Sequence, residues 1–152
     1  MNIQALVSLD RTECAVQCNS KKRILEIISD IAAETNAEIQ KEDALNALLS
    51  REKMGSTGIG NGIALPHGRL ANLSNVTAVV VTTTPAIAFD AIYDKPVDIF
   101  FAILVPENQT EGHLQTLATI AGKLSQKSIV KTIRNAESKE QVIAALCDEA
   151  AQ

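Results

Sequence analysis

The stretch from Val97 to Val105 constrains the fold more than any other part of the sequence. Eight of its nine residues are apolar, and only Asp98 is polar. A strand with one face in water alternates apolar and polar residues, whereas a strand buried on both faces is apolar almost throughout. Proline is disfavoured inside a central strand, and Pro106 follows directly. The stretch therefore predicts a central strand that is covered on both faces and ends at Pro106.

Two amphipathic helices are predicted in the first third of the chain. Ser20 is a typical N-cap residue, and the residues after it follow the spacing of one buried helix face, namely Ile24, Ile27, Ile28 and Ile31. A second helix is predicted from about Lys41 to Lys53, with Gly55 stopping it. Its expected apolar stripe consists of Leu45, Leu48 and Leu49.

Three further helices are predicted in the last third. One starts near Thr110 and has an expected buried face of Leu114, Leu117, Ala118, Ala121 and Leu124. A shorter helix carries Ile129, Val130 and Ile133. The last helix opens with a capping box from Ser138 to Gln141, and its buried side is expected to hold Val142, Ile143, Leu146, Cys147 and Ala150.

Other strands complete the predicted sheet. Val76 to Thr83 is β-branched almost throughout, and short extended pieces are predicted at 14–18 and 63–65. A turn region is predicted over 90–96. Since no repeat, linker or low-complexity tract divides the chain, we expect one domain over residues 1–152. The predicted fold class is α/β, with a mixed β-sheet flanked by helices on both faces.

Composition excludes several classes of function. The net charge of −4 argues against a nucleic-acid-binding protein, which would show a basic face. The N-terminus has no signal-peptide pattern and no apolar run is long enough for a bilayer, so we expect a soluble, cytoplasmic protein without membrane insertion. Cys14, Cys18 and Cys147 lack framework spacing and are interpreted as small buried residues. With two histidines in the chain, neither a metal site nor a cofactor is expected.

A glycine-rich segment carries the strongest functional signal. Four glycines fall within residues 55–62, and the segment ends in Pro66-His67-Gly68. It is not a phosphate-binding Walker loop, because Gly62 is followed by Ile63-Ala64, and it lacks the third glycine of the dinucleotide fingerprint. Two interpretations remain: the loop presents backbone N–H groups to an anion, or its glycines only allow tight turns.

Three side chains are candidates for chemistry. His67, between a proline and a glycine, is interpreted as a presented nucleophile rather than a packing residue. Arg51, in the last turn of its helix, either binds phosphate oxygens or simply complements the helix dipole. His113, in a first helical turn, either faces an anion or is an ordinary helix residue. Local sequence does not decide between the alternatives for Arg51 and His113.

The segment from Arg51 to Gly68 closely resembles the active-site signature of enzyme IIA domains of the bacterial phosphotransferase system, mannitol/fructose class. The Gly-Ile-Gly-Asn-Gly variant at 58–62 is most similar to the nitrogen-regulatory members. Further likeness lies at 20–23, 87–92, 96–98 and 105–106, so the resemblance covers nearly the whole chain.

The resemblance implies that His67 accepts a phosphoryl group from a histidine-containing phosphocarrier protein, flanked by Arg51 and His113. Nitrogen-type members of the family regulate partner proteins, including potassium-transport components, according to phosphorylation state. Sugar-type members instead pass the group to a cysteine of an enzyme IIB. Both outputs remain open at this stage, with the regulatory one favoured, as do a purely binding regulator and a sensor of small anions.

Overall fold

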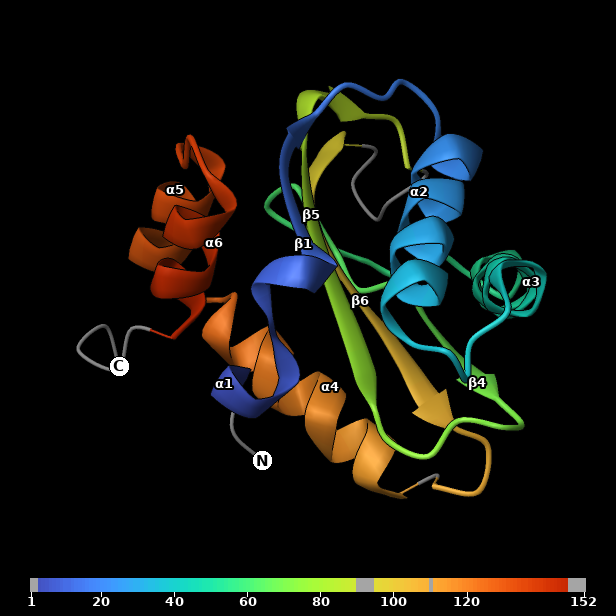
Figure 1. Ribbon diagram of the computed structural model, residues 1–152. Coiled ribbons are helices and arrows are strands. Elements are labelled where there is room, and N and C mark those ends of the chain that lie inside the picture. Colours follow the sequence, from blue (N-terminus) through green and yellow to red (C-terminus); the bar gives the residue numbers. More distant parts are fainter. Residues whose placement is uncertain (1–2, 90–94, 110, 148–152) are drawn as a thin grey trace.

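The computed structural model describes residues 3–89, 95–109 and 111–147, and for residues 111–113 it describes the backbone alone (Figure 1). One six-stranded mixed sheet forms its centre. The strands are β1 (Thr12–Val16), β2 (Gly58–Gly60), β3 (Ile63–Ala64), β4 (His67–Leu70), β5 (Thr77–Ile87) and β6 (Val97–Pro106). The order β1-β5-β6-β3-β2, with β4 also paired to β6, confirms the predicted mixed α/β fold.

Strand β6 is the centre of the sheet, as its apolar sequence predicts. It pairs antiparallel with β5 on one edge and parallel with both β3 and β4 on the other. Successive side chains of a strand point to opposite faces. Accordingly Phe100, Ala102 and Leu104 join one core cluster, while Ile99, Phe101, Ile103 and Val105 join the other.

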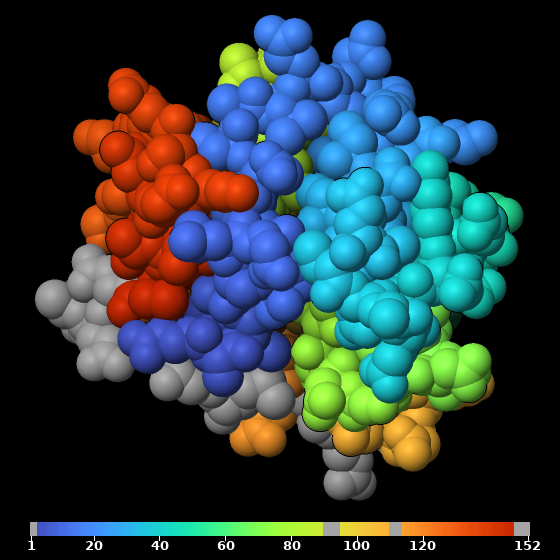
Figure 2. Space-filling view, in the orientation of Figure 1, coloured from blue at the N-terminus to red at the C-terminus, as the bar shows by residue number. Residues whose placement is uncertain are grey.

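Helices cover both faces of this sheet (Figure 1). On one face lie α2 (Lys21–Thr35) and α3 (Lys41–Lys53). On the other lie α1 (Ile3–Leu6), α4 (Glu111–Lys123), α5 (Lys127–Arg134) and α6 (Lys139–Leu146), and a short 3₁₀ turn at Leu9–Arg11 precedes β1. Figure 2 shows α5 and α6 (orange to red) packed beside the N-terminal segment (blue).

Two predicted helix caps are confirmed. The Ser20 hydroxyl accepts a hydrogen bond from the Arg23 N–H at 3.1 Å, and the Ser138 hydroxyl accepts one from the Gln141 N–H at 3.2 Å. The return bond of the second capping box differs from expectation, because the Gln141 side chain accepts from the N–H of Glu137 rather than from that of Ser138. The predicted bounds of the 41–53 helix are those of α3.

The predicted buried faces need two corrections. In α2, Leu25, Ser29 and Ala32 are buried with Ile24 and Ile28, whereas Ile27 and Ile31 lie at the margin of the core. In α4, Leu114 is 69% exposed, so its predicted burial is wrong, and Ala118 is exposed as well.

The physical reason is that a different side of α4 packs against the core. Its buried side carries Thr116 and Ile120, followed by Leu124 just after the helix, and Leu117 and Ala121 are partly buried. The alternative stripe that includes Leu114 has a similar helical spacing, so sequence periodicity did not separate the two faces.

Some sequence predictions fall on residues outside the described part of the structure, and others concern the cysteines and membrane insertion. The predicted turn at 90–96 lies largely outside the described residues, as does Ala150. Cys14, Cys18 and Cys147 are free thiols, of which Cys18 is buried and the other two are half-buried. Among the described residues, no helix is both long and apolar enough to cross a membrane.

The glycine-rich segment forms a small hairpin rather than an open loop. Strand β2 pairs antiparallel with β3, and the turn between them is Asn61-Gly62. Asn61 and Gly62 have φ of 56° and 78°, a left-handed conformation that glycine and asparagine adopt most readily.

Gly68 allows β4 to lie directly on α3. A Cβ placed there would be 2.9 Å from the Ala47 Cβ and 3.1 Å from its carbonyl carbon, closer than such atoms normally approach. By contrast, a Cβ at Gly122 in α4 would meet nothing within 4 Å.

Replacing these two glycines by alanine should have opposite effects on the free energy of unfolding. Gly68→Ala forces β4 away from α3 and should lower the free energy of unfolding by about 1–3 kcal/mol. Gly122→Ala should raise it by roughly 0.5–1 kcal/mol, because alanine is favoured in helices. Chemical denaturation of both variants measures the difference, and equal effects would contradict the close approach at Gly68.

Candidate functional site

His67 begins β4, at the edge of β6. Its backbone lies in register with Ile103, and the preceding Pro66 carbonyl accepts a hydrogen bond from the Ile103 N–H at 2.9 Å. The ring is half-buried, and Nδ1 lies 2.7 Å from the carbonyl oxygen of Leu65. Since a carbonyl only accepts, Nδ1 carries the proton and donates it, which leaves Nε2 as the basic nitrogen.

Arg51 approaches Nε2 from α3. Its Nε lies 3.2 Å from His67 Nε2 and donates to it. Residues four apart lie on one face of a helix, so the contact of Ala47 with Gly68 places Arg51 beside His67. The guanidinium also donates to the Gly55 carbonyl at 2.8 Å, which fixes its orientation.

This environment favours the neutral imidazole. Burial is the main cause that lowers the pKa of His67 below its usual value, and the Arg51 guanidinium acts in the same direction. The Leu65 carbonyl and the Glu52 carboxylate oppose them. A neutral ring with its Nδ1 proton fixed has the protonation state that a nitrogen nucleophile needs.

A buried carboxylate holds the chain next to Arg51. The Glu52 side chain is 4% exposed, and its two oxygens accept from the Thr57 N–H at 3.2 and 3.1 Å. The ammonium of Lys21, in α2, neutralises it at 3.3 Å. The turn after α3 is therefore tied at Gly55 by Arg51 and at Thr57 by Glu52.

The same ammonium connects this turn to the end of β5. Lys21 donates to the Phe89 carbonyl at 3.4 Å and lies 4.5 Å from the centre of the Phe89 ring. The Ser56 hydroxyl donates to the same carbonyl at 3.2 Å. Two helices, the turn and the segment after β5 thus share one buried polar network.

Three amides of the glycine-rich segment have partners within the protein. The N–H groups of Gly55, Thr57 and Gly58 already donate to the Glu52 carbonyl, the Glu52 carboxylate and the Ser56 hydroxyl. The backbone cradle for an external anion is therefore wrong for these three amides. Of these three amides, the one that binds an anion is that of Thr57, and its anion is the protein's own Glu52 carboxylate.

An open groove of about 560 Å³ lies over His67 and Arg51. Met54 and Leu114 line it and are 82% and 69% exposed. Arg69 adds a second cation. Sequence analysis did not identify Arg69 or Leu114 as part of the site. For Arg69 a signal was available, because side chains two residues apart on a strand lie on the same side, and Arg69 follows His67 by two.

His113 lies in the first turn of α4, as predicted. Its side chain is outside the described part of the structure. The next residue, Leu114, lines the groove over His67, so the start of α4 lies beside the other two candidate residues.

Comparison with known proteins identifies the class. The model of the family "Phosphoenolpyruvate-dependent sugar phosphotransferase system, EIIA 2" matches residues 5–149, and the chain belongs to this family.

A curated protein of Escherichia coli K12, named "Nitrogen regulatory protein", is 45% identical over 97% of this chain and 91% of its own length. The crystal structure of nitrogen regulatory protein IIA-Ntr from Neisseria meningitidis superposes with a TM-score of 0.88 at 39% identity, covering 95% of this chain and 98% of that one. A "PTS system fructose-specific EIIA component" of Haloferax volcanii is 35% identical over 81% of this chain and 80% of its own. Within the family, the chain is thus most similar among these three proteins to the two named nitrogen regulatory proteins.

Removing the guanidinium should raise the pKa of His67. Arg51→Gln removes a positive charge that disfavours the imidazolium, so NMR titration of the His67 ring should give a higher pKa than in the wild type. In the wild type the ring should titrate below about 6.5.

The lowered pKa of His67 in the folded state also makes the free energy of unfolding depend on pH. As the pH falls through about 6.5, the unfolded state takes up a proton that the folded state resists, so the free energy of unfolding should decrease. A His67→Asn variant should lose this part of the slope between pH 7 and 5. If the pH dependence of the free energy of unfolding is the same in this variant and the wild type, the fold does not lower the pKa of the His67 ring.

Lys21 and its exposed neighbour Lys22 form a matched pair. Lys21→Met leaves Glu52 buried without its cation and should lower the free energy of unfolding by up to about 3 kcal/mol. Lys22→Met removes the same charge from the surface and should change it by less than about 0.5 kcal/mol. Urea denaturation of both tests whether the ion pair holds the turn.

Proposed function

We propose that His67 Nε2 is the phosphoryl acceptor of this enzyme IIA. The donor is a phosphohistidine on a histidine-containing phosphocarrier protein. A bond forms between Nε2 and phosphorus while the phosphorus–nitrogen bond of the donor breaks, and the donor imidazole leaves with that electron pair. The Nδ1 proton of His67 stays on its bond to the Leu65 carbonyl throughout.

The fixed tautomer is the observation that carries this proposal. The 2.7 Å contact of Nδ1 with the Leu65 carbonyl orients the ring and keeps the lone pair on Nε2, which faces Arg51. Phosphoryl transfer depends mostly on positioning and on stabilising the charge of the phosphoryl oxygens. Both requirements are met around one nitrogen atom.

Arg51 supplies the positive charge for those oxygens. Its Nε, which donates to Nε2 before transfer, is close enough to donate to a phosphoryl oxygen once Nε2 is substituted. Arg69, on the same groove, adds a second positive charge on the side of the incoming donor. We assign His113 the same flanking role, on the strength of its resemblance to the family.

The exposed apolar residues of the groove suit a protein donor. Met54 and Leu114 border His67 and Arg69, and together they make a mixed apolar and cationic surface. Protein interfaces commonly combine exposed methionine and arginine in this way. The apolar residues suit contact with the donor protein, and the cations suit its phosphoryl group.

We propose a regulatory output in the cytoplasm. Phosphorylation adds about −1.5 to −2 charges to a groove whose cations are Arg51 and Arg69. A partner that binds the cationic groove would be released, and a partner that binds the anionic form would be recruited. The names of the nitrogen regulatory relatives support targets in nitrogen metabolism. Potassium-transport proteins are proposed as targets from the resemblance to the nitrogen-type members alone.

A second output is transfer to the cysteine of an enzyme IIB during sugar uptake. The fructose-specific relative of Haloferax volcanii, at 35% identity, is the observation that favours it. Mixing the phosphorylated protein with an enzyme IIB separates the two outputs, because only the sugar-type protein would lose its phosphoryl group rapidly.

Intact-mass measurement tests the acceptor. After incubation with phosphoenolpyruvate, enzyme I and the phosphocarrier, the wild type should gain one acid-labile phosphoryl group. His67→Ala should gain none, and Arg51→Gln should gain it roughly 10²–10³-fold more slowly.

The outcomes of this experiment are distinct. No gain in the wild type, while another enzyme IIA is labelled in the same mixture, would exclude phosphoryl acceptance. Labelling of His67→Ala would place the acceptor elsewhere. ³¹P–¹⁵N NMR of the product would show Nε2 substitution, and a signal from Nδ1 would overturn the assigned tautomer.

A further inference from the structure

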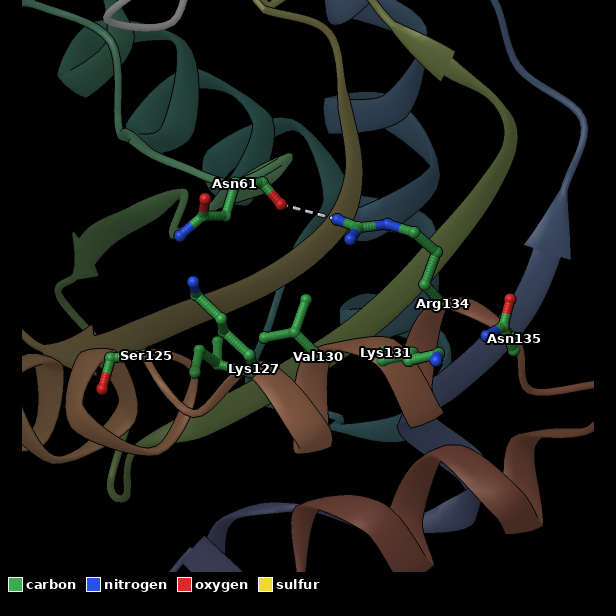
Figure 3. Close-up of a pocket in the computed structure, with 8 residues that line it drawn as sticks. Asn61, Ser125, Lys127, Val130, Lys131, Arg134 and Asn135 are labelled. Atoms are coloured by element: carbon green, nitrogen blue, oxygen red, sulfur yellow. Dashed lines mark hydrogen bonds between the residues drawn. The ribbon is translucent and has the colours of Figure 1, made fainter.

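A second cavity, of about 200 Å³, lies between the Asn61 turn and α5 (Figure 3). It is distinct from the groove over His67 and shares none of its lining residues. Leu124 and Val130 form its apolar floor and are 1% and 6% exposed. The floor belongs to the core that packs on β6, so the cavity has a rigid base.

The rim of this cavity is cationic. Lys127, Lys131 and Arg134 follow one another along α5 at spacings of four and three residues, which places them on one side of the helix. In Figure 3 the Lys127 ammonium points toward Asn61, across the cavity. Ligand pockets combine an apolar lining with a few polar or charged groups, and here the charged groups are cationic, which suits an organic anion.

Arg134 joins the two walls of the cavity. Its Nε and Nη2 donate to the Asp98 carboxylate at 2.7 and 2.9 Å, and Nη2 also donates to the Asn61 carbonyl at 2.6 Å. A Cβ on Gly62 would lie 2.6 Å from Nη2, so the turn requires glycine to admit the guanidinium. The wall is therefore held in place before any ligand binds.

The charges of this region do not balance. Asp98 neutralises Arg134, but among the described residues Lys127 and Lys131 make no ion pair. Two like charges four residues apart on a helix repel each other, and the whole chain has a net charge of −4. In Figure 3 the Lys131 ammonium points toward Asn135, away from that of Lys127, and an anion bound at the rim would offset the excess positive charge of both.

We propose that this cavity binds a small organic anion, with a carboxylate or phosphate group beside Lys127 on the Asn61 side, Lys131 adding positive charge to the rim, and an apolar body on Leu124 and Val130. The size sets the class of ligand, because a cavity of about 150 Å³ holds benzene and drug-sized ligands occupy about 300–1,000 Å³. A body of one small ring or a short carbon chain fits. The proposal does not depend on phosphorylation of His67.

NMR titration at constant ionic strength tests this proposal. The probes are phenyl phosphate and benzoate, with inorganic phosphate lacking the apolar body and benzyl alcohol lacking the charge. At least one organic anion should give saturable amide shifts at Asn61 and in residues 124–135, and should bind at least tenfold tighter than both controls. Which anion binds distinguishes a phosphate from a carboxylate ligand.

Matched variants check the charges. Lys127→Gln/Lys131→Gln should weaken binding at least tenfold, while Lys22→Gln/Lys53→Gln, which removes the same charge from α2 and α3, should leave it unchanged. Both pairs change side chains on the surface, and the circular dichroism spectrum confirms that the variants fold.

Three results would overturn the proposal. The first is the absence of saturable shifts with either organic anion. The second is equal binding by wild type and Lys127→Gln/Lys131→Gln. The third is binding of an acidic peptide at these residues while neither small anion binds, which would make the cavity part of a protein interface.

Discussion

The burial of β6 on both faces is the constraint on which the rest of the structure depends. Because its side chains enter two separate cores, helices must cover the sheet on both sides. On the edge of β6 opposite β5, two short strands pair with it one after the other, β3 and then β4, and Leu65-Pro66 separates them. That interruption is where the functional site forms, since the Leu65 carbonyl is turned toward the His67 ring instead of toward a neighbouring strand.

The position of His67 follows from this pairing, but its electrostatics depend on α3. The contact of Gly68 with Ala47 sets the distance between strand and helix, and one turn later that distance brings Arg51 to His67. Arg51 lowers the pKa of His67 and also donates to its Nε2. The same group thus keeps the ring neutral before a phosphoryl group arrives and offers a positive charge once it is attached.

Much of this arrangement was predictable from sequence, because local patterns determine it. The apolar run of β6, the bounds of α3 and the Ser20 cap are each encoded within a few residues. The exposure of Leu114 was not predictable, since two faces of α4 have similar spacing and only packing selects one. The buried Glu52–Lys21 pair and the contact of Arg134 with Asn61 join residues 31 and 73 positions apart, and no local pattern reports them.

The glycine-rich segment shows why its interpretation from sequence was only half right. One of its amides, that of Thr57, does bind an anion, but that anion is the Glu52 carboxylate, and Gly62 admits the guanidinium of Arg134. Glycine at position 62 lets the charged side chain of Arg134 reach the backbone of the turn. A phosphoryl group on His67 would therefore be neutralised mainly by side chains, with Arg51 and Arg69 in place. Side chains can move toward a new charge, whereas hydrogen-bonded amides of a hairpin cannot do so without breaking it.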